Sequence, residues 1–168
     1  RWEDALRDHE VDIDRALEAR RQLEHASAYL ELHIEQGPVL ESMQLPLGAV
    51  LGTFGVERHR ITWRGQAAHA GSTPMDQRRD ALAGAAKLAL EIRPIAAQGG
   101  DGAVCTSGGV VTKPGIVTSV VETAEQLLDM RHLDADKLAE LNRDAREASE
   151  RFAAEEDIEV EWERIWEI

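Results

Sequence analysis

This chain of 168 residues lacks several features that define other protein classes. Its single cysteine, Cys105, cannot form an intrachain disulfide, which favours a reducing, cytoplasmic setting. The chain has only 19 basic residues but 32 acidic ones, so its formal net charge is −13. This charge argues against nucleic acid or an anionic membrane as a partner. No apolar run approaches the roughly 20 residues of a membrane-spanning helix, and the acidic N-terminus lacks the apolar segment of a secretion signal.

The residues that are present suffice for a folded domain, because 43% of them are apolar. Apolar residues from Ile13 to Leu23 fall at near-helical spacing and predict a helix in the charged N-terminal part. The alternation of apolar and polar residues over 29–34 predicts a strand. Gln36-Gly37-Pro38 should end that strand, and residues 39–43 predict a short helix.

A clearer order of elements begins near residue 56. The expected elements are a strand at 58–64, a helix begun by Thr73 and Pro74 and ended by Pro94, strands at 103–111 and 117–131, a helix capped by Asp134, and a strand at 158–163. This βαββαβ order predicts an α+β, ferredoxin-like domain in which two helices cover one face of a four-stranded antiparallel sheet. An edge strand of such a sheet is a natural place for a second copy to add.

Three motifs carry a family resemblance: YLELHIEQGPVLE at 29–41, GQAAHAGSTPMDQRRDAL at 65–82 and LLDMRHLD at 127–134. In this order they resemble the metal-dependent amidohydrolases of the M20 peptidase superfamily. Within that superfamily, the chain is similar to the N-carbamoyl-L-amino acid hydrolases and allantoate amidohydrolases, also called hydantoinase/carbamoylase amidases. The similarity extends from Ala28 to the C-terminus.

The resemblance implies a two-domain enzyme. Its catalytic domain would hold two divalent metal ions (Zn, Mn, Co or Ni). A smaller lid domain would form a homodimer and contribute substrate contacts, partly to the neighbouring subunit. On this basis, residues 1–55 correspond to a strip of the catalytic domain and residues 56–168 to the lid.

Several segments of the family pattern are absent from the sequence. It has neither the His-x-Asp segment with its downstream bridging aspartate, nor the Glu-Glu pair that follows that segment, nor the last metal-binding histidine. The chain therefore resembles a central piece of a longer enzyme. We expect it to be inactive by itself and to bind no metal tightly.

His33 matches the metal-ligand histidine of the first motif, and imidazole is a good ligand for Zn²⁺, Mn²⁺ or Co²⁺. Without the motif, a lone histidine in a strand would be interpreted as structural or merely exposed. Gln36 follows closely, and two interpretations of it remain open. It either donates a hydrogen bond to substrate near the metals or acts as a turn amide that caps local backbone.

His69 matches the lid histidine that the family places in the active site of the neighbouring subunit. There the imidazole would stabilise the oxyanion that forms when metal-bound water attacks the carbonyl. The small residues at 67–71 permit close approach of another surface. The alternative is a histidine whose hydrogen bonds are satisfied within a loop before a helix.

Arg131 matches the arginine that binds the substrate carboxylate, and a planar guanidinium suits such a ligand. The alternative is a strand-end salt bridge, for example to Asp129 or Asp134. Arg58 aligns with a further substrate-contacting arginine of the allantoate branch, although exposed arginines are common in strands. Thr118 departs from the family's usual asparagine, which indicates a different substrate choice or another way of holding the ureido group.

Three functional interpretations follow. The first is part of a metal-dependent amidohydrolase that cleaves a C–N bond of an N-carbamoyl-L-amino acid or a related ureido acid, which is a small-molecule carboxylate. The second is an aminoacylase or dipeptidase of the same superfamily, which the residue sequence of the first two motifs disfavours. The third is a stand-alone dimerisation or binding module without catalysis, and it best describes the isolated 168 residues.

Overall fold

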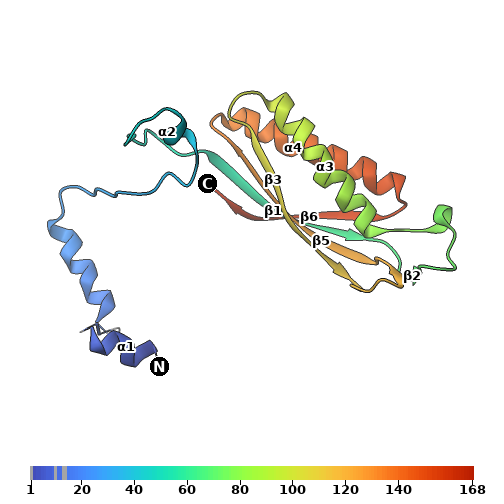
Figure 1. Cartoon of the computed structure of the whole chain (residues 1–168), viewed down its shortest axis with the longest axis horizontal. Helices are drawn as coiled ribbons and strands as arrows, with labels where there is room; N and C mark the ends of the chain where they lie inside the picture. The colour runs from blue at the N-terminus through green and yellow to red at the C-terminus, as the bar shows by residue number, and fades with distance from the viewer. Residues whose placement is uncertain (1, 10, 13–14) are drawn as a thin grey trace. The chain divides into compact units, whose positions relative to one another are not determined.

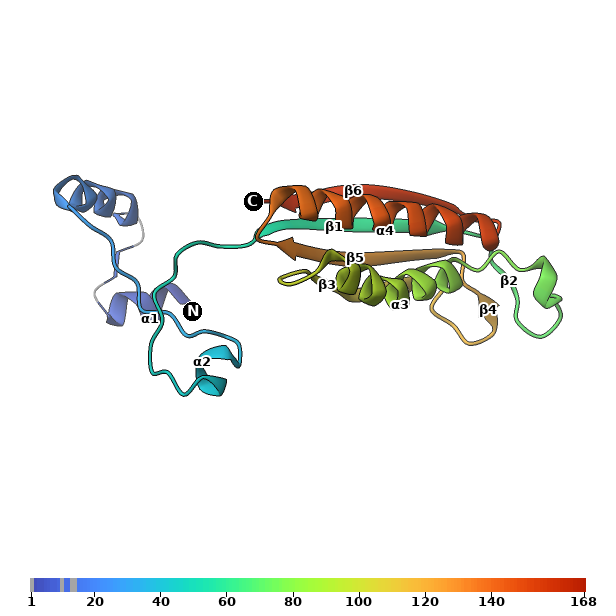
Figure 2. The ribbon, with the colours of Figure 1, turned by 90° about the horizontal axis from the view of Figure 1, so that it is seen from above.

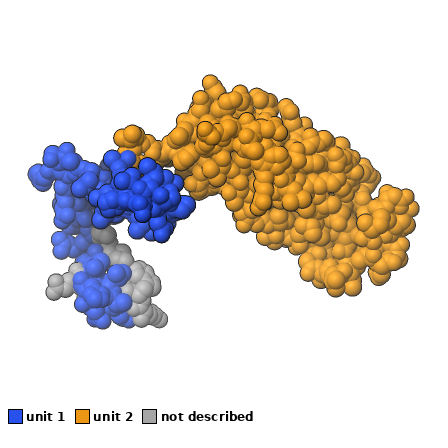
Figure 3. Space-filling view, turned by 45° about the horizontal axis from the view of Figure 1, so that its top comes forward, with its two compact units in different colours: residues 1–49 blue, residues 50–168 orange. Residues whose placement is uncertain are grey.

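The computed structural model describes residues 2–9, 11–12 and 15–168. The chain forms two compact units, Arg1–Ala49 and Val50–Ile168 (Figure 3). The predicted assignment of residues 1–55 to a catalytic strip and of 56–168 to a lid stays a prediction. Within the described ranges, no helix is both long enough and apolar enough to cross a membrane.

The described part of the first unit contains three short helices. They are α1 (Trp2–Asp8), the 3-10 helix η1 (Ala16–His25) and α2 (Val39–Ser42). α2 confirms the short helix predicted at 39–43, and the Glu35 carboxylate caps it by accepting from the N–H groups of Val39 and Leu40, both at 2.8 Å. Ile13, where the predicted N-terminal helix began, lies outside the described residues.

The strand predicted at 29–34 is wrong. The chain is irregular there, and Leu30, Leu32 and Ile34 are exposed. A strand is stable only when its backbone N–H and C=O groups pair with a neighbouring strand. The described part of the first unit contains no strand that could supply this pairing.

The second unit is built on a four-stranded antiparallel sheet in the order β3-β5-β1-β6 (Figure 1). These strands span Gly55–Arg64 (β1), Val104–Lys113 (β3), Thr123–His132 (β5) and Glu159–Glu167 (β6). Helix α3 (Ala81–Gly99) lies between β1 and β3 in the chain, and α4 (Ala135–Glu155) lies between β5 and β6. The predicted α+β class is therefore confirmed, whereas the ferredoxin-like assignment stays a prediction.

Both helices lie on one face of this sheet and pack against each other (Figure 1, Figure 2). Alternate residues of β1 and β5 point toward the helices and form the core. Trp63 is fully buried, and its indole N–H donates to Gln126 Oε1 at 3.1 Å. Gln126 in turn donates to the Ala85 carbonyl at 3.2 Å, so these polar groups are paired inside the core.

A two-stranded sheet extends the unit beside α3. β2 (Ala68–His69) pairs with β4 (Ser119–Val120). The sequence predicted β4 and β5 as one long strand at 117–131. The chain changes partner between Val120 and Thr123, because β5 joins the four-stranded sheet instead. β-Branched residues at the beginning and alternation at the end indicated one strand, but the sequence did not reveal this change of partner.

α3 begins later than predicted. Its N-cap is Asp80, whose carboxylate accepts from the backbone N–H two residues further on at 2.9 Å. Thr73, the predicted N-cap, precedes only a short 3-10 helix, η2 (Met75–Gln77). Ala81 is fully buried and its N–H donates to the Val121 carbonyl at 3.0 Å, so contact with the neighbouring segment fixes the true start.

α3 also continues past Pro94, which was predicted to end it. Proline removes the N–H that would bond the carbonyl of Leu90, four residues earlier. Both residues are exposed, so water can replace the lost donor. Ile95 then returns to the core, where it is 6% exposed.

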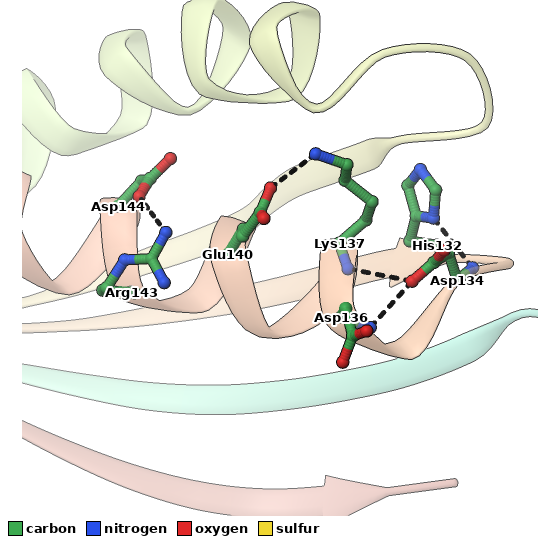
Figure 4. Close-up of polar contacts among 7 residues, drawn as sticks. All are labelled: His132, Asp134, Asp136, Lys137, Glu140, Arg143 and Asp144. Carbon is green, nitrogen blue, oxygen red and sulfur yellow. Dashed lines mark hydrogen bonds and ion pairs between the residues drawn. The ribbon is translucent and has the colours of Figure 1, made fainter.

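α4 begins where the sequence predicts. One carboxylate oxygen of its N-cap, Asp134, accepts from the N–H groups of Asp136 at 2.8 Å and Lys137 at 3.2 Å (Figure 4). These backbone bonds, led by the one from Lys137, lower the pKa of Asp134. The Asp134 N–H donates to Nδ1 of buried His132 at 2.9 Å, which ties the helix start to the end of β5.

Candidate functional site

His69 ends the short strand β2, and the β2–β4 ribbon fixes its backbone. His69 lies opposite Ser119 in the register, and the next N–H, of Ala70, donates to the Thr118 carbonyl at 2.9 Å. The two predicted site residues His69 and Thr118 are therefore brought together, and both are exposed. They form the first candidate group.

The His69 side chain is oriented by its own loop. Nδ1 accepts a hydrogen bond from the Gly71 N–H at 3.1 Å. A ring nitrogen that accepts carries no proton, so in the neutral imidazole the proton is on Nε2. The exposed ring can therefore donate through Nε2–H to a developing negative charge.

Arg131 and Arg58 share one carboxylate on the face of the sheet opposite the helices, called the open face below. Arg131 donates to Asp129 through Nε at 2.6 Å and through Nη2 at 3.2 Å. Arg58 donates through Nε at 2.8 Å to Asp129 Oδ2, the oxygen that also accepts from Arg131 Nη2. The strand register places Arg58 directly opposite Asp129, so the charged side chains of Arg58, Asp129 and Arg131 meet here. They form the second candidate group.

The electrostatics of this group favour charged forms. Burial by itself would raise the pKa of Asp129, but the hydrogen bonds and charges of Arg131 and Arg58 outweigh it and hold that pKa below its usual value. The Arg58 guanidinium also lies 4.6 Å from the Trp166 ring centroid. One carboxylate thus balances only one of two guanidinium charges, and the group keeps a net positive charge that suits an anion.

A shallow cavity of about 410 Å³ opens beside this group. Its lining residues are Phe54, Val104, Thr106, Asp129 and Arg131. It combines a guanidinium with an aromatic and an aliphatic wall, which suits a small carboxylate that carries an apolar side chain. Phe54 and Val104 were not predicted as site residues. The register between β3 and β5 places Val104 opposite Arg131, and the path of the chain into β1 places Phe54; neither can be seen in the sequence.

The two groups lie at opposite ends of β1. Arg131 is opposite Val56 at the start of the strand, whereas the His69 loop follows Arg64 at its end. In Figure 1, β2 lies at the far end of the sheet from the start of β1. At about 3.3 Å per residue, Val56 and Arg64 are roughly 25 Å apart. A small substrate cannot contact His69 and Arg131 of one copy at the same time.

His33 and Gln36 lie in the first unit and are exposed. His33 Nδ1 donates to the Ile34 carbonyl at 2.5 Å, which leaves the Nε2 lone pair for a ligand bond. Gln36 has a left-handed φ of 57°. Among the described residues, no group of three or more His, Cys, Asp or Glu is placed to hold a metal ion, so these residues do not make a metal centre on their own.

No family model matches the chain, but comparison with known proteins gives N-carbamoyl-L-amino acid and allantoate amidohydrolases among its relatives. An N-carbamoyl-L-amino acid amidohydrolase of Geobacillus stearothermophilus is 36% identical over 165 residues, which cover 98% of this chain and 40% of the relative. The allantoate amidohydrolase of Escherichia coli is 34% identical over 134 residues, which cover 80% of this chain and 33% of the relative. The chain thus spans well under half the length of these relatives.

Solved structures agree with this kinship. An amidase of the hydantoinase/carbamoylase family from Burkholderia multivorans matches with a TM-score of 0.76 at 34% identity, over 80% of this chain and 33% of that one. AtUAH in complex with glyoxylate matches with a TM-score of 0.77 at 26% identity, over 80% and 32%. The chain is therefore homologous to the hydantoinase/carbamoylase amidases. More particularly, it corresponds to one part of the N-carbamoyl-L-amino acid and allantoate amidohydrolases.

Proposed function

We propose that the whole protein hydrolyses a C–N bond of an N-carbamoyl-L-amino acid or a related ureido acid in the cytoplasm. The observation that carries this proposal is the Arg131 guanidinium at the wall of the open-face cavity, with Arg58 beside it. A paired arginine cluster with surplus positive charge suits the carboxylate that every such substrate bears. The names of the relatives, and the glyoxylate bound in AtUAH, support a small carboxylate as the ligand.

His69 would act on the reacting carbonyl. Its Nε2–H is free to donate, because Gly71 already bonds Nδ1. A donor aimed at the oxygen that gains negative charge stabilises the transition state more than the ground state. Thr118 lies beside His69 and would contact the ureido group through its hydroxyl, where an asparagine is usual in the resembled family.

The distance between the two groups favours a homodimer. Val56, opposite Arg131, and Arg64, just before the His69 loop, are roughly 25 Å apart along β1. Each active site would therefore take Arg131 from one copy and His69 from the other. Mixing His69→Ala with Arg131→Ala protein tests this idea. Because random exchange makes half the dimers mixed and each mixed dimer has one intact site, about a quarter of wild-type activity should return. No recovery after confirmed exchange would contradict it.

Two divalent metal ions would complete the catalytic centre of the whole protein. His33 would supply one ligand through Nε2, and the remaining ligands would lie in parts of the relatives that this chain does not match. The metals would supply an activated water as nucleophile. On this proposal Gln36 would hydrogen-bond substrate close to the metals, and the isolated 168 residues would show no hydrolysis.

The decisive assay compares substrates on the whole protein supplied with Zn²⁺, Mn²⁺, Co²⁺ or Ni²⁺. Release of free amino acid from N-carbamoyl-L-amino acids, or ammonia from allantoate, supports the proposal. Activity restricted to N-acetyl amino acids or dipeptides would replace it with the aminoacylase or dipeptidase alternative. Absence of hydrolysis for every substrate and metal would favour a binding module, which isothermal titration with the same carboxylates would then detect.

A further inference from the structure

The loop that carries His69 spans residues 65–80 and is tied at both ends. At its base, the Gly65 N–H donates to the Glu122 carbonyl at 2.7 Å, and the Gln66 N–H donates to the Arg79 carbonyl at 2.9 Å. At its far side, the β2–β4 ribbon holds Ala68 and His69. The Ala70 N–H also donates to the Thr118 carbonyl at 2.9 Å, but the stretch from Gly71 to η2 lies outside these ties, so its shape depends on other bonds.

Arg78 supplies those bonds. Its Nη2 donates to the Ala70 carbonyl at 2.7 Å and to the Thr73 carbonyl at 3.1 Å, and its Nε donates to the Thr73 carbonyl at 3.2 Å. The Thr73 N–H donates to the His69 carbonyl at 3.1 Å. The half-buried guanidinium therefore closes the turn that begins at His69 and ends at Thr73.

This arrangement needs the geometry of arginine. A guanidinium carries its N–H donors in one rigid plane, so it can bind two carbonyl oxygens at the same time. An ammonium is a point charge on a flexible stem and does not fix the angle between two carbonyls in this way. Arg79, the next residue, does something different: its side chain pairs with Asp157, away from the turn.

We propose that Arg78 is a positioning residue for His69. By holding the Ala70 and Thr73 carbonyls, it fixes the turn in which the Gly71 N–H reaches His69 Nδ1, and so keeps the proton on Nε2 and directed outward. The inference rests on the proposed function of His69, but the geometry it describes belongs to the chain itself. It can therefore be tested in this chain and in the whole protein separately.

The first test is nuclear magnetic resonance on the ¹⁵N-labelled chain at about pH 8, where imidazole is neutral. Long-range ¹H–¹⁵N correlations should show His69 with Nδ1 as the unprotonated nitrogen. Arg78→Gln should give a mixture of tautomers and faster exchange of the Gly71 amide. The matched control Arg79→Gln removes the same charge one residue away and should leave both signals unchanged. An unaltered His69 spectrum in folded Arg78→Gln would overturn the inference.

The second test is kinetic and uses the whole protein. Arg78→Gln should lower kcat by about tenfold to a hundredfold, the range expected when a transition-state donor is misplaced, with KM nearly unchanged. Arg78→Lys should recover little of that loss, and Arg79→Gln should behave like wild type. A disturbed His69 signal with unchanged kcat would keep the positioning role and reject the catalytic role of His69. Equal losses of kcat in the Arg78→Gln and Arg79→Gln variants would contradict the positioning role.

Discussion

Arg131 donates to Asp129 through its Nε at 2.6 Å, and the two residues lie two positions apart on the same side of β5. The sequence left open whether Arg131 binds substrate or forms such a salt bridge. The structure joins the two interpretations, because Asp129 occupies Nε and part of Nη2 while Arg131 still lines the cavity. Asp129 can orient Arg131 toward a substrate carboxylate only if the N–H groups of Arg131 that do not bond Asp129 face that substrate.

Arg131→Lys tests whether the fork geometry matters. In the whole protein we expect KM for an N-carbamoyl amino acid to rise by about tenfold or more, because an ammonium cannot bind Asp129 and a ligand carboxylate in one plane. We expect a smaller change in kcat. Steady-state kinetics over a substrate series gives both values.

Arg64→Lys is the matched control for that experiment. Arg64 lies at the other end of β1 and pairs across the strands with Glu161 at 3.6 Å. Its substitution should leave KM unchanged. A KM that rises equally in both variants would mean that the effect comes from general surface charge and would reject Arg131 as the carboxylate residue.

Asp134→Ala should lower the thermal unfolding midpoint of the chain. The substitution removes the acceptor for two N–H groups at the start of α4 and leaves them without a side-chain partner. Asp134→Ser restores an N-cap oxygen and should recover most of the loss. Circular dichroism melting of the three proteins measures this, and an Asp134→Ala midpoint equal to wild type would contradict the role of the cap.

His59 makes stability depend on pH near neutrality. The imidazole is 1% exposed, and burial is the main cause that lowers its pKa, although the hydrogen bond to Glu57 at 2.9 Å acts in the opposite direction. The positive charges of Arg146 on α4 and Arg164 on β6 lower this pKa further. The folded chain therefore binds a proton at His59 less tightly than the unfolded chain does.

The consequence is a loss of stability in mild acid. As pH falls through about 6.5, the unfolded chain gains a proton at this position before the folded chain, so the free energy of unfolding decreases until the lower folded pKa is reached. Above about pH 6.5 this contribution is complete and constant. Urea unfolding between about pH 5 and 8 measures the slope, which His59→Gln should flatten. His25→Gln, at an exposed position, should keep it; a persistent slope in His59→Gln would assign the effect to another group.

Local signals were enough to predict several regular elements of the second unit. Alternation located β1 and β6, and Asp134 with the apolar spacing after it located α4. Contacts distant in sequence decided the cases that failed. Thr73 and Asp80 are both suitable N-caps, and the bond from Ala81 to Val121 decides between them.

The candidate site was only partly predictable for the same reason. Motif resemblance singled out His69, Arg131 and Arg58 as separate residues, but it carried no information on which of them meet. Arg58 joins Arg131 because the antiparallel register places Asp129 opposite Arg58. His69 lies far from this pair because β1 separates them along its length. This separation can be recognised only once the strand order is known.

Gly84 provides a test of how tightly α3 packs on the sheet. A Cβ at this position would lie 2.8 Å from both Trp63 Cε3 and Ile158 Cδ1. The Trp63 ring is fully buried and held by its bond to Gln126, so it cannot move aside. Gly84→Ala gains about 1 kcal/mol in helix propensity, whereas overpacking a core costs about 1–3 kcal/mol.

We therefore expect Gly84→Ala to destabilise the chain by about 1 kcal/mol, with an unfolding midpoint lower by a few degrees. Gly109→Ala is the control, since a Cβ there meets nothing within 4 Å. Its midpoint should stay close to wild type. If Gly84→Ala were instead more stable than wild type, helix propensity would outweigh the contact, and the close packing of α3 on Trp63 would be rejected.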